Sequence, residues 1–138
     1  MIWSVDGVRS LEFAEPRLTN RNQFSCTATL VLEGAPSSVE LSMITPYRSM
    51  WFAFFRDLAD DLADNPEGWK GQRVWYSEFE EITVACANEG GGLIKMTVAM
   101  WPEGDDDERS GTLTIRPEDI GRVRDELPQF LSLPAELR

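Results

Sequence analysis

The strongest constraint in the sequence is a strict two-residue alternation of apolar and mostly polar side chains over residues 24–32. Successive side chains of a β-strand point to opposite sides, so this pattern predicts a strand with one buried and one solvent-exposed face. Such a face has to be covered by another layer of secondary structure. The apolar positions of the alternation are Phe24, Cys26, Ala28, Leu30 and Leu32.

Shorter segments with the same alternation predict further strands, which are separated by turn signals. Residues 16–22 are read as a turn-rich link, residues 34–38 as a turn, and Gly90-Gly91-Gly92 as a hairpin connection. The predicted strands are 10–13, 24–32, 39–43, 74–77, 82–87, 94–100 and 113–115.

The apolar spacing changes to a helical period in two places. One is residues 47–64, where Trp51, Phe55, Leu58 and Leu62 form a stripe. The other begins at Pro117, with acidic residues in its first turn, as helix starts favour. We expect Pro128 to kink or break this second helix, because proline removes a backbone donor and clashes with the preceding turn. The inner stripe of the second helix is Ile120, Val123, Leu127 and Leu131.

These elements predict one α+β domain over residues 1–138. We expect a meandering antiparallel β-sheet of about six to seven strands with two helices packed on one face. Ile44-Thr45-Pro46 and Ile115-Arg116-Pro117 both lead from a strand through one linker residue to a proline and a helix. The chain therefore reads as two β-β-β-α-type halves, which either a duplication or independent use of the same helix start would explain.

The charge of the chain excludes several partners. Asp and Glu number 24 against 13 Lys and Arg, so the formal net charge is −11, and the basic residues do not cluster. A phosphate-binding or anionic membrane surface needs a basic patch, so we expect neither nucleic acid nor membrane as a partner. The first residues lack the pattern of a signal peptide. We expect a bacterial-type protein of the cytoplasm.

Histidine is absent and cysteine occurs twice. Catalysis that depends on imidazole and metal sites that use histidine are therefore excluded, and no phosphate-binding glycine motif occurs. We expect no catalytic residues, no cofactor and no resident metal. Cys26 and Cys86 are read as buried free thiols, with a disulfide between them as the alternative.

The aspartates of the first predicted helix are the candidate binding residues. Asp57, Asp60, Asp61 and Asp64 share one side of it at i, i+3, i+4 and i+7. Like charges at this spacing destabilise a helix, and several of these lie toward its C-terminal end, where the dipole disfavours them. A basic partner would explain them. The alternatives are a solvated helix face, or Mg²⁺ or Ca²⁺ held with help from the acidic segment 78–81.

Aromatic residues add a second set of candidates. Phe52 lies off the apolar stripe, and Trp69 stands in a turn between Gly68 and Lys70-Gly71. Trp69, Trp75 and Trp101 at element edges either cap the core or form a recognition surface. The acidic run 105–108 is read as a solvated loop, since the position where a calcium loop needs glutamate is Arg116.

Residues 51–61, Trp-Phe-Ala-Phe-Phe-Arg-Asp-Leu-Ala-Asp-Asp, precede the turn 68–71 and the Val74-Trp75 strand. This stretch resembles a family of uncharacterised small bacterial proteins of actinobacterial type, a domain of unknown function. Its members have a Phe-Phe-Arg-Asp-Leu-Ala helix end followed by a Trp-x-Gly turn. The resemblance implies a small single domain with no assigned activity. It also implies a shared structural or binding role for Arg56, Asp57, Trp69, Gly71 and Trp75.

The leading functional hypothesis is a non-catalytic protein-binding module that presents Phe52, the helix aspartates and Trp69 to a basic protein. One specific form is an immunity-type protein that neutralises a basic toxin. The alternatives are a carboxylate-dependent cation-binding protein or enzyme, and a self-associating structural protein joined through a strand edge or a solvent-exposed sheet face.

Overall fold

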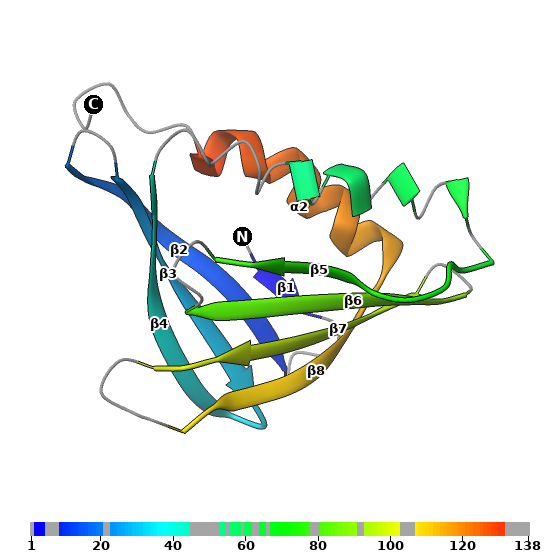
Figure 1. Cartoon of the computed structure of the whole chain (residues 1–138), viewed down its shortest axis with the longest axis horizontal. Helices are drawn as coiled ribbons and strands as arrows, with labels where there is room; N and C mark the ends of the chain where they lie inside the picture. The colour runs from blue at the N-terminus through cyan, green and yellow to red at the C-terminus, as the bar shows by residue number, and fades with distance from the viewer. Residues whose placement is uncertain are drawn as a thin grey trace.

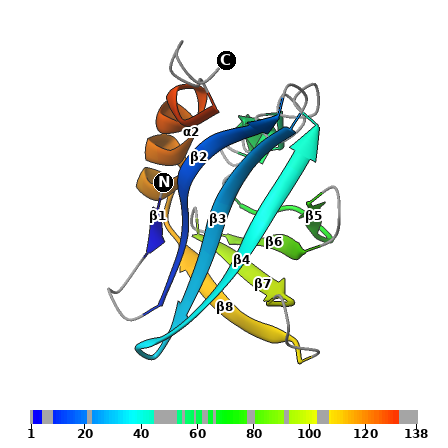
Figure 2. The same ribbon diagram turned by 90° about the vertical axis from the view of Figure 1, so that its left-hand side faces the viewer.

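The computed structural model of the chain has two four-stranded sheets and the helix α2, with a further helical segment between the sheets in sequence (Figures 1 and 2). It describes residues 2–4, 9–20, 23–44, 53–54, 56–58, 60–61, 64–65, 67–77, 81–90, 93–102 and 107–131.

The first sheet is an antiparallel meander in the order β1-β2-β3-β4. Glu33 and Gly34 connect β3 to β4 with φ angles of 54° and 84°, the positive values that a two-residue hairpin turn requires. β2 contains a register shift next to Glu15, whose φ is 56°. The strands are β1 (Ile2–Ser4), β2 (Ser10–Asn20), β3 (Gln23–Leu32) and β4 (Ala35–Ile44).

The second sheet repeats this arrangement in the order β5-β6-β7-β8, again entirely antiparallel. Short connections join its neighbours, and α2 (Pro117–Leu131) follows its last strand. The strands are β5 (Arg73–Tyr76), β6 (Ile82–Gly90), β7 (Leu93–Met100) and β8 (Arg109–Ile115).

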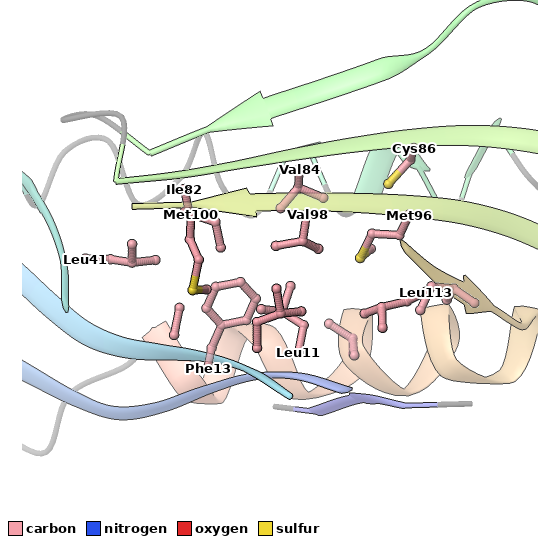
Figure 3. Packing of buried hydrophobic residues seen from close by; sticks show 14 of the residues in the cluster. Leu11, Phe13, Leu41, Ile82, Val84, Cys86, Met96, Val98, Met100 and Leu113 are labelled. Atoms are coloured by element: carbon pink, nitrogen blue, oxygen red, sulfur yellow. The ribbon is translucent and has the colours of Figure 1, made fainter. Parts of the chain in front are cut away.

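The inner faces of the two sheets pack against each other and form the core (Figure 3). The predicted inward residues of β3 from Phe24 to Leu30 are buried, and so are those of β6 from Ile82 to Cys86 and of β7 from Ile94 to Met100. The two-residue period therefore placed the apolar faces of these strands correctly.

Both helical segments add side chains to this core. Every described residue between Ala53 and Asp64 is helical, and Leu58 is buried. Trp51, Phe55 and Leu62 of the predicted stripe lie outside the described side chains. Ile120 and Val123 of α2 are buried, and Phe130 meets Phe24 edge to face at 6.2 Å between ring centroids.

The start of α2 at Pro117 is confirmed. The carboxylate of Asp119 accepts a hydrogen bond from the backbone N–H of Arg116 at 3.2 Å, which satisfies a donor at the helix start. Asp119 is buried and also pairs with the guanidinium groups of Arg116 and Arg122. Its charge is thus compensated where the positive end of the helix dipole favours it.

The antiparallel α+β class is found, but the predicted single sheet is wrong, because the strands form two sheets. Each half contributes four strands and then a helical segment, rather than three strands and a helix. Alternation shows that one face of each strand is buried, without showing whether a helix or another sheet covers it. Here the two apolar faces largely cover one another.

Three local predictions are also corrected. Residues 16–20 belong to β2, because the bulge next to Glu15 accommodates Pro16 without ending the strand. Residues 35–38 belong to β4, where Pro36 is tolerated because β4 is an edge strand. α2 continues through Pro128 to Leu131, so proline does not break the helix within its last turn, which Phe130 holds against Phe24.

Cys26 and Cys86 are both free and buried, as predicted, and the alternative of a disulfide is wrong. Burial raises the pKa of the Cys26 thiol from 9.0 to about 12. Burial raises the pKa of the Cys86 thiol by the same amount, from 9.0 to about 12. Both thiols are therefore inert in the folded chain at neutral pH.

We expect the stability of the protein to fall above pH 9. In the folded state both thiols keep their protons up to a pKa of about 12, whereas in the unfolded state they lose them at a pKa of 9.0. The contribution of the two thiols to the free energy of unfolding is therefore complete below pH 9 and is lost between pH 9 and 12. Each thiol contributes a slope of about 1.4 kcal/mol per pH unit in this range. Urea unfolding between pH 8 and 11 measures it. The double variant Cys26→Ala/Cys86→Ala should show a flatter slope, and equal slopes would contradict the prediction.

Replacing Gly121 with alanine should stabilise the protein by about 0.5–1 kcal/mol, because alanine restricts the unfolded chain and favours the helix. A Cβ at Gly121 in α2 meets nothing within 4 Å. Gly111→Ala is the contrasting variant, since its Cβ would overlap the side chain of Leu32 and force that side chain to move. Thermal unfolding of both variants checks the sign of each effect.

Candidate functional site

The four helix aspartates divide into two kinds. Asp57 pairs with its neighbour Arg56 at 3.3 Å, and Asp61 pairs with Arg73 of β5 at 3.0 Å. Asp60 and Asp64 are exposed, and the described part of the chain offers neither an ion pair. The carboxylates that remain for another molecule are therefore chiefly those of Asp60 and Asp64.

Arg73 links three elements near the end of this helix. Its Nε donates to Oδ2 of Asp61 at 3.0 Å, and its guanidinium carbon lies 5.2 Å from the centroid of the Trp69 ring. The salt bridge joins the helix to β5, and the cation–π contact joins β5 to the Trp69 turn. Both side chains of the ion pair remain partly exposed, so its stabilising effect is small, and its main consequence is to fix the relative position of these groups.

The turn before Trp69 is anchored to the end of β6. The amide of Asn88 donates to the carbonyl of Asn65 at 3.1 Å, and its Oδ1 accepts from the N–H of Gly90 at 2.9 Å. Gly68 has a φ of 106°, and a Cβ there would lie 3.1 Å from the carbonyl oxygen of Asn88. Close packing and backbone conformation both require glycine at this position.

An open cleft of about 390 Å³ lies between the helical segment and β5. Its walls combine carboxylate, guanidinium and apolar groups, and its base includes the buried Leu58. A site of this composition suits a side chain that has an apolar stem and a charged end. The lining residues are Phe54, Asp57, Leu58, Asp61, Gln72, Arg73 and Val74.

The aromatic candidates have different positions. Trp69 and Trp75 are partly buried and pack against the core, and the Trp75 ring lies 6.5 Å from that of Phe54. Nε1 of Trp69 is buried and has no hydrogen-bond partner within the described residues. Trp101 is exposed. Phe52 lies outside the described residues.

Arg56 and Gly71 were predicted to have structural or binding roles. Arg56 is exposed and its ion pair with Asp57 is local, whereas the long-range contact to the Trp69 turn comes from Arg73. Gly71 has a φ of 79° in open surroundings, so a left-handed backbone alone favours glycine there.

Glu81 lies apart from the helix aspartates. Its carboxylate accepts hydrogen bonds from the Ser77 hydroxyl at 2.6 Å and from the backbone N–H of Ser42 in β4 at 3.1 Å. It therefore joins the two sheets. Glu78 and Glu80 are outside the described residues. No group of three or more acidic or cysteine side chains within the described ranges could hold a metal ion.

Sequence reasoning missed two residues of this region. Arg73 had no signal, because its partners Asp61 and Trp69 come together only in the fold. Asn88 was detectable from the sequence, because it follows Ile82, Val84 and Cys86 at the same two-residue spacing and is therefore a polar residue at an inward position. A buried amide at such a position has to find partners, and it finds them in the turn and hairpin backbones.

Comparisons with known proteins identify the family of the chain. A family model described as a family of unknown function, DUF6228, matches residues 2–133, so the chain belongs to this family, in agreement with the resemblance seen in the sequence. No curated protein matches. One similar solved structure is described as "Crystal structures of trypanosoma bruciei MRP1/MRP2". It shares 9% identity over 95% of this chain and 81% of that one, with a TM-score of 0.46. Within the described residues, no helix has the length and apolar character needed to cross a membrane.

Gly68→Ala should destabilise the protein by about 2–3 kcal/mol and Gly71→Ala by about 1 kcal/mol, because both force alanine into a strained backbone but only the first also crowds Asn88. Urea unfolding at neutral pH compares the two. If the two variants lose equal stability, the close packing of the turn on β6 is not energetically important.

Proposed function

We propose that this member of DUF6228 is a non-catalytic protein-binding module that receives a basic partner on its acidic helical segment and the adjoining cleft. The observation that carries the proposal is the position of Asp60 and Asp64. Both are exposed, and neither has an ion-pair partner in the described part of the chain, whereas Asp57 and Asp61 do. Exposed carboxylates on the helical segment that lines an open cleft give a basic side chain both a charge partner and a cavity.

The surroundings of these carboxylates are held in place. Arg73 ties the helix to β5 and to Trp69, and Asn88 ties the following turn to β6. A binding surface on fixed elements loses little entropy when a partner docks, so contacts made there contribute more fully to affinity. Phe54 and Val74 add apolar area to the same cleft.

The net charge of −11 supports the same class of partner. A strongly acidic chain attracts basic proteins over distances of about a Debye length and speeds their association. An immunity-type role in the bacterial cytoplasm, in which the chain would cover and neutralise a basic toxin, is the specific form that we favour. It requires no chemistry from the chain itself, only a surface that matches the toxin.

Neutralising the two exposed aspartates Asp60 and Asp64 should weaken the binding of a basic ligand. A labelled peptide of alternating lysine and leucine serves as the probe, because it offers the charged and apolar groups that the surface would take. We expect Asp60→Asn/Asp64→Asn to raise the Kd of the peptide about 5-fold or more, equivalent to about 1 kcal/mol. Fluorescence polarisation over a range of salt concentrations measures it.

The matched control is Glu118→Gln/Asp125→Asn, which removes the same charge from two exposed acids of α2. It should change the Kd less than about 2-fold, since these two exposed acids do not line the cleft and their charge is screened by solvent and salt. Equal effects of the two double variants would show that net charge alone attracts the peptide, and the helix surface would then lose its special role. A peptide Kd that is insensitive to salt would also contradict the proposal.

A further inference from the structure

The outer face of the β5–β8 sheet, which points away from the core, differs from the rest of this acidic chain. The register places on it the alternate residues Val74 and Tyr76 of β5 together with the outward residues of β6, β7 and β8. We propose that this outer face is the interface between two copies of the chain. The outward residues of β6 to β8 whose side chains the structure describes are Thr83, Ala85, Ala87, Leu93, Lys95, Thr97, Ala99, Ser110, Thr112 and Thr114.

The outer face differs from the rest of the chain in charge. Among the described side chains at the paired positions of β5 to β8, Lys95 carries the only charge on this face, and the exposed Glu108 stands just beyond the last pair, opposite Trp101. Two chains of net charge −11 repel each other, and the repulsion is smallest when they meet through a surface with few acidic groups. The outward side of the β1–β4 sheet is different, since Glu12 and Glu40 lie there.

Exposed apolar side chains gather on the same face. The large hydrophobic residues that are exposed in the described part of the chain are Val74 at 49%, Tyr76 at 59%, Leu93 at 42% and Trp101 at 42%. All four have the outward parity of this sheet, because Trp75, Ile94 and Met100 next to them point inward. Trp101 extends β7 by one step, since its N–H donates to the carbonyl of Glu81 at 3.2 Å. Exposed apolar residues gathered on one face mark an interaction surface.

The shape and size of the outer face suit contact with a second sheet of the same kind. Alanine, serine and threonine occupy the middle of the face, so two such sheets can approach at about 10 Å. Four strands about 4.8 Å apart and about 24 Å long give roughly 450 Å² of flat area per copy. The exposed side chains of Val74, Tyr76, Leu93 and Trp101 raise the buried area for two copies to about 1,000 Å², which is the lower limit of a specific interface. The dimer is therefore weak, and it forms at micromolar concentrations or above.

A second copy fits this face better than a basic protein does, because a face whose described side chains include Lys95 and no paired carboxylate offers a basic partner no attraction. An interface with two-fold symmetry places the same surface on both sides, so apolar groups meet apolar groups. The strand edges of the sheet are less available: the helical segment lies beside β5 through the Asp61–Arg73 pair, and Arg9 donates to the carbonyl of Thr112 in β8. The long stem of Lys95 lets its ammonium group reach solvent at the rim.

Sedimentation velocity of the full chain from about 1 µM to about 1 mM tests the proposal, with a dimer expected to appear as concentration rises. Thr97→Glu places a carboxylate in the middle of the face, twice in each dimer, and should raise the dimer Kd about 10-fold or more. Thr29→Glu is the matched control, because Thr29 is an equally half-buried threonine on the outward side of the other sheet. It should change the Kd less than about 2-fold.

The dependence on salt and a second variant complete the test. Salt at about 1 M should strengthen the dimer, because it screens the repulsion between two acidic chains. Tyr76→Ser removes an exposed ring with little effect on folding and should raise the dimer Kd about 3-fold. If circular dichroism shows that Thr97→Glu is unfolded, the dimer Kd of Tyr76→Ser tests the proposal in its place. A wild-type chain that stays monomeric at about 1 mM, equal effects of Thr97→Glu and Thr29→Glu, or a dimer that salt dissociates would each overturn the proposal.

Discussion

The burial of two apolar sheet faces against each other is the constraint on which the rest of the structure depends. Residues such as Phe24 in β3 and Val98 in β7 belong to one buried cluster to which both sheets contribute. A shift of one residue in any strand would turn its apolar side chains toward solvent, so the core also fixes the register. The outer faces and the positions of both helical segments follow from this packing, since Leu58 and Val123 have to reach the same core.

The sequence allowed the inner faces of β2, β3, β4, β6, β7 and β8 to be predicted, because the two-residue period is a local property of the chain. β1 was not predicted as a strand, and β5 was predicted without an inner face. It did not allow the division into two sheets to be predicted, because the layer that covers a strand depends on contacts between distant residues. The continuation of β2 past Pro16 and of α2 through Pro128 could not be predicted either, because it also depends on structure around each proline that the local sequence does not specify. A bulge accommodates one proline, and the contact of Phe130 with Phe24 holds the turn that contains the other.

The candidate site was predictable to a smaller extent. Helical spacing placed Asp57, Asp60, Asp61 and Asp64 on one segment, and the described residues of that segment are helical. The spacing could not show which of them are already paired, because Arg73, the partner of Asp61, comes from a strand of the second sheet. Asn88 was detectable as a polar residue in an apolar series, but its contact with the Asn65 carbonyl exists only once the turn docks on β6.

The arrangement of charge separates two surfaces with opposite physical requirements. The helical segment keeps exposed carboxylates at Asp60 and Asp64, and attraction of a basic partner to them weakens as salt is added. The outer face of the β5–β8 sheet has no described carboxylate at its paired positions, and association through it becomes stronger when salt screens the remaining negative charge. The two surfaces meet at Val74, which lines the cleft and also belongs to the outer face, whereas Asp60 and Asp64 belong to the helical segment and not to that face. A dimer formed through the sheet would therefore not use these two carboxylates. Two copies joined in this way would present two acidic surfaces, and a partner with paired basic sites would bind them with higher avidity than a single chain.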